Sequence, residues 1–95
     1  MKRYFVYILA SKRNGTLYVG STSNLQQRIT QHKNGTFSGF SSTYGVIHLV
    51  YYEEHINLIE MARREKRLKK WCRQWKLNLI EKINPEWRDL YQEIG

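Results

Sequence analysis

The chain has 95 residues, which suffice for one hydrophobic core but not for two. Hydrophobic residues make up 41% and aromatic residues 14%, which excludes a disordered composition. The chain has sixteen Lys and Arg but only eight Asp and Glu, which gives a formal net charge of +8 and a pI near 9.8. This charge favours nucleic acid as the partner, although an anionic membrane surface or a ribosomal location would explain it as well.

The cysteine and apolar content restrict the class of protein further. Cys72 is the single cysteine, so neither an intramolecular disulfide nor a Cys-rich zinc cluster is possible. The apolar run from Tyr4 to Ala10 is far shorter than the ~18 residues that a membrane span requires. The sequence therefore predicts a cytoplasmic protein that does not span a membrane.

The first two elements form a predicted β-hairpin. Tyr4 to Ala10 is apolar on both faces, as expected of a strand that is covered on each side. A turn at 11–15 precedes a returning strand at 16–20. A five-residue loop would place Tyr7 and Tyr18 nearly opposite each other, whereas a two-residue turn would stagger them. Both registers leave the two rings on one face of the sheet.

The middle of the chain predicts a helix and a third strand. Ser23 and Asn24 are alternative N-caps of a helix that runs through Lys33. A loop at 34–45 follows. The run from Val46 to Tyr52 is rich in β-branched and aromatic residues, which predicts a strand.

Three further helices are predicted. Asn57 caps a helix that ends at about Trp71, and another runs from about Gln74 to Ile83 with Trp75, Leu79 and Ile83 on one side. The pair Asn84-Pro85 fits an N-cap followed by proline in the first turn of a short final helix. The apolar side of that helix would carry Trp87, Leu90, Tyr91 and Ile94. The predicted order is thus β-β-α-β-α-α-α.

Glu65 is the most informative single residue. At about 100° per residue, it falls in the middle of an apolar cluster on its helix, formed by Leu58, Met61, Ala62, Leu68 and Cys72. A buried carboxylate must be paired, protonated or bound to a metal, because desolvating its charge costs several kcal/mol. The alternatives are a side chain that reaches out to solvent or a salt bridge to Arg28 or Lys69.

Eight basic residues lie between positions 63 and 76, which is half of the positive charge. Acidic residues that would pair with them are nearly absent there, so this segment predicts a surface that faces a polyanion. The predicted contacts are Arg63, Lys66, Arg67, Lys69, Lys70, Arg73 and Lys76. Trp71 and Trp75 flank the basic residues and are interpreted as core or interface anchors rather than as platforms for base stacking.

Two more polar residues lean toward the predicted sheet. Arg28 and His32 are four residues apart, about 40° around the helix, on the side that carries Leu25 and Ile29. In the plainer interpretation, His32 is a satisfied half-buried histidine and the stem of Arg28 covers apolar surface. The chain has no zinc-ligand spacing, phosphate-binding loop or nucleophile elbow that competes as a catalytic motif.

Together these residues carry a family resemblance. Phe5-Val6-Tyr7 and Tyr18-Val19-Gly20 resemble the two tyrosine motifs that the GIY-YIG nuclease superfamily places on one hairpin. Arg28 and His32 stand at the positions of that family's helix arginine and following His/Tyr residue. Glu65, in Ala-Arg-Arg-Glu, stands at the position of its catalytic glutamate. Trp-Lys-x-x-Leu-Ile at 75–80 and Asn-Pro-x-Trp-x-Asp-Leu at 84–90 resemble the small stand-alone bacterial branch.

The resemblance implies an α/β (α+β) fold, with a three-stranded antiparallel sheet flanked by helices. It implies one nuclease domain over residues 1–95, with a core at about 4–70 and a helical extension at about 72–94. It also implies catalytic roles. Glu65 would hold one Mg²⁺ or Mn²⁺, and Arg28 would neutralise charge on the phosphate. Tyr7 would be the general base, with its pKa lowered by the metal, Arg28 or His32, and Tyr18 would orient the water or share the role of base. His32 would accept a proton or donate to the phosphate.

The expected function is therefore metal-dependent endonucleolytic cleavage of nucleic acid, DNA rather than RNA, in DNA repair or processing. Structure-selective or weakly selective cleavage is expected, because no sequence-reading element is present, and recruitment by a protein partner is equally open. The rivals are a non-catalytic DNA- or RNA-binding module of the same fold and a structural or ribosome-associated protein. Peripheral membrane attachment would require an exposed apolar face, which the sequence does not predict.

Overall fold

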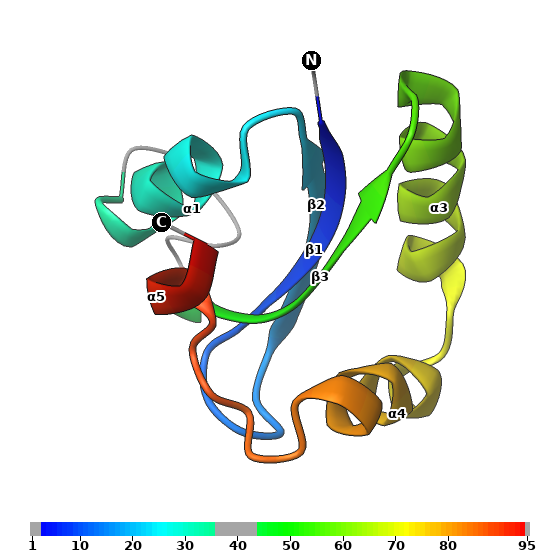
Figure 1. Ribbon diagram of the computed structural model, residues 1–95. Helices are drawn as coiled ribbons and strands as arrows, with labels where there is room; N and C mark the ends of the chain where they lie inside the picture. The colour runs from blue at the N-terminus through cyan, green and yellow to red at the C-terminus, as the bar shows by residue number, and fades with distance from the viewer. Residues whose placement is uncertain (1–2, 36–43, 95) are drawn as a thin grey trace.

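The computed structural model describes residues 3–35 and 44–94. Its elements, shown in Figure 1, are β1 (Tyr4–Ala10), β2 (Leu17–Thr22), α1 (Leu25–Lys33), β3 (His48–His55), α3 (Leu58–Lys70), α4 (Arg73–Ile83) and α5 (Tyr91–Ile94). This order confirms the predicted α+β class. Most of the loop predicted at 34–45 lies outside the described residues. Within those residues, no helix has the length and apolar character needed to cross a membrane.

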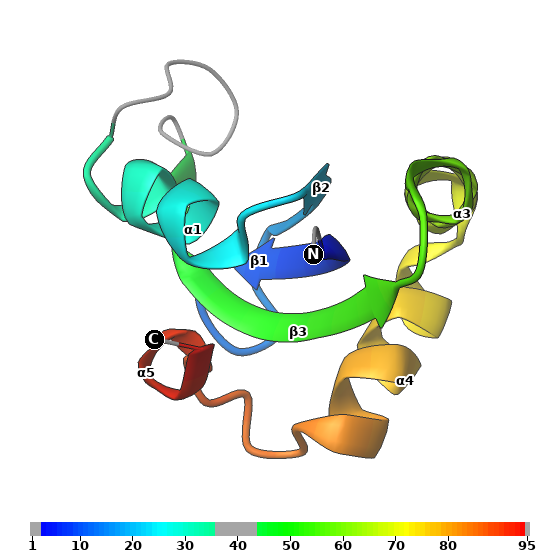
Figure 2. The same ribbon diagram turned by 45° about the horizontal axis from the view of Figure 1, so that its top comes forward.

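The central strand is buried on both faces. The sheet is antiparallel with the order β2-β1-β3, and every residue from Phe5 to Ala10 is at most 7% exposed. One face packs against α3 and α4 through Met61, Leu68 and Ile80, and the other packs against α1 through Leu25 and Ile29. Figure 2 shows the helices divided between the two faces, with α1 and α5 on one and α3 and α4 on the other. β2 is left at an edge of the sheet.

The hairpin register settles the relation between the two tyrosines. Tyr7 lies opposite Gly20 and Tyr18 lies opposite Leu9, so the rings are staggered by two positions on the same face. The loop at 11–16 is longer than a tight turn, and Ser11 N donates to Thr16 O at 3.0 Å. The shared face was predicted. β2 continues to Thr22, two residues beyond the predicted end, which brings Ser21 into the strand.

Helix caps explain where α1 and α3 begin. Asn24, not Ser23, caps α1, and its side chain accepts a hydrogen bond from Gln27 N at 3.1 Å. Asn57 caps α3 as predicted, accepting from Glu60 N at 2.8 Å. Both helices therefore start at the residue that follows an asparagine in extended backbone.

β3 is shifted relative to the prediction. It spans His48–His55 rather than 46–52, because the first half of β1 offers it backbone partners. Tyr4 pairs with His55 and Val6 pairs with Glu53. The added residues include Glu53, whose side chain reaches α3.

The predicted start of the last helix is wrong. Asn84 ends α4 instead of opening a new helix, and the final helix is limited to Tyr91–Ile94. The Asn84 side chain is 3% exposed, donates to Val50 O at 3.1 Å and Arg88 O at 2.8 Å, and accepts from Arg88 N at 3.0 Å. Trp87 has a φ of 57°, in the left-handed region, so the segment cannot be a continuous right-handed helix. Tertiary hydrogen bonds override the local capping signal here.

Asp89 then fixes the end of the chain. Its carboxylate accepts from Lys33 Nζ at 2.5 Å, Leu49 N at 3.1 Å and Tyr91 N at 3.1 Å, which joins α1, β3 and α5. Burial alone would raise the pKa of Asp89, but these donors outweigh it and hold the pKa below its ordinary value. The C-terminal segment thereby closes over the edge of the sheet next to α1.

Replacing Asn84 by alanine is expected to destabilise the protein by about 1–3 kcal/mol, because the substitution removes the side-chain partner of the buried Val50 carbonyl and of the part-buried backbone groups of Arg88. Urea denaturation followed by circular dichroism measures the change. Asn78→Ala is the matched control, because Asn78 is an exposed asparagine on the same helix. Equal stabilities of the two variants would contradict a structural role for the Asn84 side chain.

Candidate active site

Tyr7 and His32 form the buried part of the candidate site. Tyr7 on β1 has no exposed surface, and its Oη lies 3.1 Å from Nε2 of His32 on α1, which is 5% exposed. Burial raises the pKa of Tyr7 well above its ordinary value of 10.0, and the neighbouring Tyr18 adds to the rise. The expectation of a lowered Tyr7 pKa is therefore wrong for the free protein.

His32 is neutral by the same physics. Burial lowers the pKa of His32 below 6.5, and the positive charge of Arg28 lowers it further. A neutral imidazole keeps one ring nitrogen as an acceptor. Tyr7 can accordingly donate its hydroxyl proton to the hydrogen bond with His32 Nε2 when that nitrogen carries no proton.

Tyr18 completes an aromatic cluster with these two residues. The Tyr18 ring centroid lies 6.4 Å from that of Tyr7 and 5.4 Å from that of His32. Tyr18 is half-buried, whereas the other two rings lie beneath the surface. It is therefore the ring of this cluster that solvent reaches.

Gly20 makes room for the Tyr7 hydroxyl. A Cβ built at Gly20 would lie 2.5 Å from Tyr7 Oη and 3.0 Å from Tyr18 Cε1, distances that no side chain tolerates without displacing the rings. The glycine of the second motif is thus required by close approach of the phenol to β2.

Arg28 brings positive charge to the same place. It is half-buried on α1, and its charge and a side-chain hydrogen bond oppose the rise in the Tyr7 pKa. Its charge also helps to lower the pKa of Glu65. Arg28 therefore acts electrostatically on both the tyrosine and the glutamate.

Glu65 reaches the other side of β2. Its Oε1 accepts from Ser21 Oγ at 2.5 Å, and its Oε2 lies 2.8 Å from Lys69 Nζ. Burial opposes ionisation, but the hydrogen bonds from Lys69 and Ser21 outweigh it and lower the pKa of Glu65 below its ordinary value. The carboxylate is therefore ionised at neutral pH, and of the pairings left open by the sequence the salt bridge to Lys69 is present.

Consecutive residues of β2 connect the two halves of the site. Gly20 contacts the Tyr7 phenol on the α1 side, and Ser21 contacts Glu65 on the α3 side. The five residues predicted from sequence thus surround one short stretch of an edge strand. Sequence reasoning missed Ser21, whose signal would have been its position three residues after Tyr18.

The apolar cluster predicted around Glu65 is only partly correct. Met61 and Leu68 are buried, but Leu58, Ala62 and Cys72 are exposed. Leu58 is the first residue of α3 and Cys72 lies beyond its end, at the N-cap of α4, so both are outside the part of the helix that packs on the sheet. Glu65 consequently lies at the border of the buried face, with its side chain 24% exposed, rather than in the middle of it.

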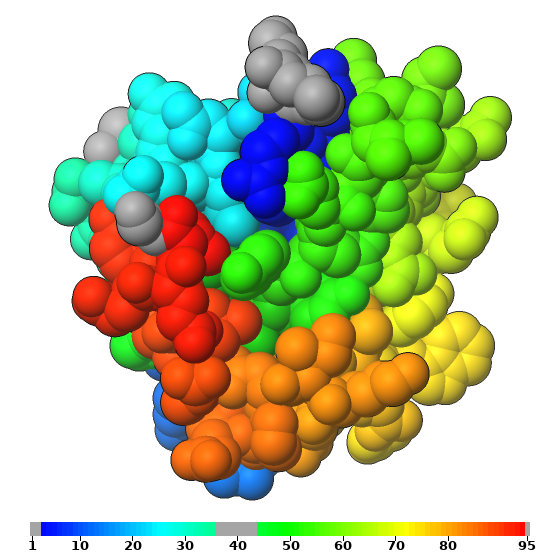
Figure 3. All heavy atoms as spheres, in the orientation of Figure 1, coloured from blue at the N-terminus to red at the C-terminus, as the bar shows by residue number. Residues whose placement is uncertain are grey.

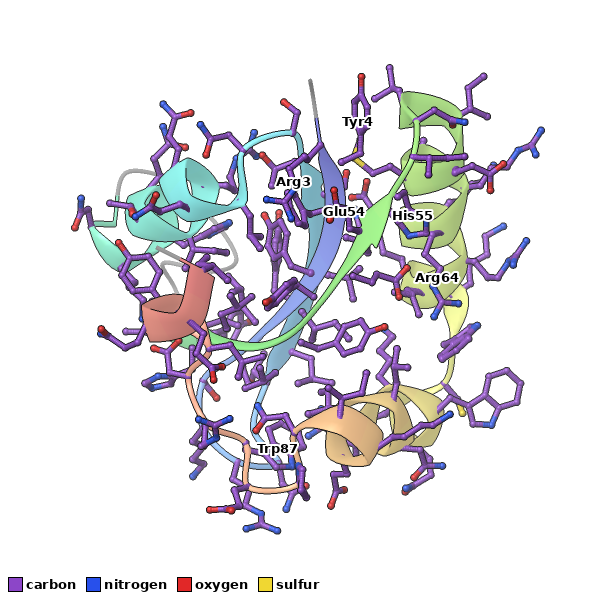
Figure 4. The ribbon with its side chains drawn as sticks, viewed as in Figure 1. Arg3, Tyr4, Glu54, His55, Arg64 and Trp87 are labelled. Carbon is purple, nitrogen blue, oxygen red and sulfur yellow. The ribbon has the colours of Figure 1, made fainter. Side chains whose placement is uncertain are left out.

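A second ionic cluster fixes the rotation of α3. Glu53 on β3 accepts from Tyr51 Oη at 2.5 Å and from Arg64 Nε at 2.9 Å, and its Oε2 lies 2.5 Å from His55 Nε2. Burial would raise the pKa of Glu53, but these hydrogen bonds hold it below its ordinary value. Figure 4 shows Arg64 on the side of α3 that faces β3 and His55. Because Arg64 precedes Glu65, this contact helps to direct Glu65 toward β2.

The basic residues of α3 do not share one face. At about 100° per residue, Lys69 and Lys66 lie about 40° and 100° from Glu65, on the side away from Arg64 and β3. Lys70, Arg63 and Arg67 lie about 140° to 160° from Glu65, on the outer side of the helix. Beyond α3, Arg73 donates to Asn14 O at 2.7 Å and Gly15 O at 2.6 Å, and Lys76 is half-buried. The predicted set therefore divides into residues near the site and residues remote from it.

The fold and the arrangement of these residues define the class of protein. Residues 3–78 match the GIY-YIG catalytic domain family, so the chain belongs to that family. A GIY-YIG catalytic domain implies nuclease-type activity and nucleic-acid binding in general.

Its relatives are small proteins of similar length. The chain is 38% identical to the UPF0213 protein SH2523 of Staphylococcus haemolyticus over 81 residues, covering 85% of this chain and 98% of the relative. It is 38% identical to the UPF0213 protein CPE1444 of Clostridium perfringens over 91 residues, covering 96% and 97%. The solution NMR structure of the UPF0213 protein BH0048 from Bacillus halodurans aligns with a TM-score of 0.57 and 25% identity, covering 92% of each chain. These similarities confirm the predicted family and its small, stand-alone form.

The lowered pKa of His32 predicts a pH dependence of stability. As pH falls below about 6.5, the unfolded chain takes up a proton on His32 before the folded protein does. The free energy of unfolding therefore becomes smaller as the pH is lowered. Denaturant titrations at closely spaced pH values should show this slope, and His32→Gln should flatten it. Glu53, Glu65 and Asp89 titrate below their ordinary values and contribute at more acidic pH. An unchanged slope in the variant would contradict the assignment.

Proposed function

We propose that the protein is a divalent-metal-dependent endonuclease that hydrolyses phosphodiester bonds in DNA, in repair or processing. The observation that supports this most is the convergence on β2 of an ionised carboxylate and a buried Tyr7–His32 hydrogen bond, with Arg28 beside both. Glu65 is the candidate ligand for a cation, Arg28 is the candidate partner of the phosphate, and the Tyr7–His32 pair is the candidate proton acceptor.

The donor atoms suit a hard cation that is shared with the substrate. Glu65 supplies a carboxylate, and the Ser21 hydroxyl lies beside it. Within residues 3–35 and 44–94, no group of three or more His, Cys, Asp or Glu side chains is placed to hold a metal ion. These residues fit Mg²⁺ or Mn²⁺, which bind through one or two carboxylates with water and substrate phosphates completing the shell. The bound ion would neutralise charge on the phosphate under attack.

The tyrosine and histidine provide a route for the proton of the attacking water. The raised pKa of Tyr7 makes a resident phenolate unfavourable at neutral pH, so Tyr7 acts as a relay. Because Tyr7 has no exposed surface in the free protein, the side chains around it must shift to admit the water. As the water oxygen then bonds to phosphorus, its proton passes to Tyr7 Oη while the Tyr7 proton passes to His32 Nε2, 3.1 Å away. The bond to the leaving oxygen breaks, and that oxygen takes a proton from solvent. Tyr18, at the solvent side of the pair, orients the water.

The guanidinium of Arg28 serves the phosphate. A planar, permanently charged donor matches the geometry of phosphate oxygens and gains strength where water is excluded. The half-burial of Arg28 satisfies the second condition. Arg28 and the cation at Glu65 would then approach the phosphate from opposite sides of β2.

Glu65→Ala is expected to lower the rate of DNA cleavage by about 100-fold or more, because it removes the carboxylate that holds the cation and several kcal/mol of charge stabilisation. Labelled single-stranded, duplex and branched DNA are incubated with Mg²⁺ or Mn²⁺, and with chelator as a negative control. Glu60→Ala, at an exposed glutamate on the same helix, should cleave like the wild type. Cleavage that survives Glu65→Ala would exclude this mechanism, and salt-sensitive binding without any cleavage would favour the non-catalytic binding module.

Lys66→Ala is expected to weaken DNA binding and to reduce the slope of log affinity against log salt by about 1, because one phosphate contact is lost. Turnover at saturating DNA should persist, since Lys66 touches none of the reacting groups. Arg67→Ala removes the same charge from the remote side of α3 and serves as the matched control. Fluorescence anisotropy between 50 and 200 mM salt, roughly the range in which such contacts are resolved, compares the two. An equal loss of DNA affinity in both variants would contradict a binding surface on the Glu65 side of α3.

A further inference from the structure

The outward face of α4 carries an apolar surface that the fold does not use. The sequence places Trp75, Leu79 and Ile83 on one side of the helix, yet Trp75 is 58% exposed and Ile83 is 62% exposed. The helix packs on the sheet through Ile80, with Leu77 and Leu79 partly buried against the same core, which leaves Trp75 and Ile83 uncovered. The interpretation of Trp75 as a core anchor is therefore wrong.

Trp71 and Trp75 form an aromatic corner where α3 meets α4. Their ring centroids lie 5.7 Å apart and their planes are nearly perpendicular, at 87°. The rings line an open hollow of about 290 Å³ together with Asn78, Leu79 and Lys82. In Figure 3, the segment that joins the two helices (yellow) protrudes at the margin of the molecule. The corner is accordingly accessible to a large partner.

The corner is held rigidly from behind. The Arg64 guanidinium lies 5.0 Å from the centroid of the Trp71 ring, and the same guanidinium is tied to Glu53 at 2.9 Å. The Trp71 ring is thereby fixed by β3 before any partner arrives. A fixed aromatic surface loses little conformational entropy when a planar group stacks on it.

The charges around the corner favour a polyanion. Lys82 lines the hollow, and Lys76 follows Trp75 in the chain. The nearest acid on the helix, Glu81, lies about 120° away from Trp75. A second hollow of about 280 Å³ adjoins this surface and is lined by Thr16, Leu17, Arg73 and Lys76.

The second hollow leads to the candidate active site. Leu17 lies on the same face of β2 as Ser21, whose hydroxyl contacts Glu65. Arg73 is fixed beside Leu17 by its hydrogen bonds to the carbonyls of Asn14 and Gly15. Because Trp75 and Lys76 are consecutive, the aromatic corner and the cationic hollow are adjacent. Together with β2 they form a path along which an extended strand could run.

We propose that the Trp71–Trp75 corner stacks an unpaired base of a nucleic-acid strand whose neighbouring phosphates lie at Arg73 and Lys76, with the strand leading on to Ser21 and Glu65. The assignment of that strand as substrate rests on the proposed nuclease function; the stacking does not. A base inside a duplex is covered by its neighbours, so only unpaired nucleotides can use the corner. The corner thus selects DNA with a single-stranded segment.

Binding is measured in chelator, so that no cleavage occurs, by anisotropy of a labelled oligothymidylate, an abasic strand of equal length and a duplex. Wild-type protein should bind oligothymidylate more tightly than the abasic strand. Trp75→Ala should weaken oligothymidylate binding by about 5- to 150-fold, as expected for loss of one stacked base, and leave the abasic strand and the duplex nearly unchanged. Trp75→Phe should retain part of the affinity.

Ile83→Ala is the matched control, because Ile83 is exposed to a similar degree on the same helix. Circular dichroism checks that each variant is folded. Equal affinities of wild type and Trp75→Ala for oligothymidylate would overturn the proposal. So would a wild-type dimer in sedimentation that Trp75→Ala dissociates, because the corner would then be a protein interface.

The experiments distinguish failure of the nuclease proposal from failure of the stacking proposal. Glu65-dependent cleavage with no preference for bases over the abasic strand would overturn the corner and leave the nuclease standing. Base-dependent binding that requires Trp75, without cleavage of any substrate, would support the corner and overturn the catalytic function.

Discussion

The hydrogen bond between Tyr7 and His32 ties the hydrophobic core to the candidate active site. Tyr7 lies on the central strand, where both faces are covered by helices, and its ring packs in the same cluster as Leu25 and Ile29 of α1. The hydroxyl is enclosed together with the ring and lies against His32, Gly20 and the Arg28 side chain. The same enclosure that stabilises the sheet raises the pKa of Tyr7 and lowers that of His32. Both groups are therefore held in neutral forms, between which one proton can move.

The glutamate on the far side of β2 has the opposite character. Its charge is stabilised by Ser21, Lys69 and Arg28, so it is ionised and half-exposed rather than buried and neutral. A cation that binds Glu65 must displace or share the oxygen that now pairs with Lys69. Exposed i,i+4 pairs contribute only about 0.3–0.5 kcal/mol, so this exchange costs little. The released ammonium would then be available to a phosphate. The site thus combines a rigid buried half with an adaptable half on α3.

Sequence patterns predict the parts of this structure that depend on local rules. The alternation of faces along a strand places Tyr7 and Tyr18 together in both of the registers considered for the turn, and asparagine caps set the start of α1 and α3. Asn84 shows where such rules fail. Its local context matches a helix N-cap, but its side-chain amide donates a hydrogen bond to the carbonyl of Val50 on a distant strand. No local pattern encodes that contact.

The same limit applies to the helix faces. A helical projection identifies which side of α3 and α4 is apolar, yet it assumes that the whole side is covered. The sheet covers only the middle of α3, and α4 turns Ile80 rather than Trp75 toward it. Ser21 escaped prediction for a related reason, because its importance comes from a partner 44 residues away.

The distribution of positive charge also bears on function. Of the eight basic residues between 63 and 76, Arg64, Lys69 and Arg73 make close contacts with acidic side chains or backbone carbonyls. In the described part of the chain, Lys66, Arg67, Lys70 and Lys76 form no ion pair within 4.0 Å. Like charges at this density repel one another and destabilise the compact state. Folding therefore does not account for them, whereas neutralisation by a polyanion, which releases counterions as it binds, does.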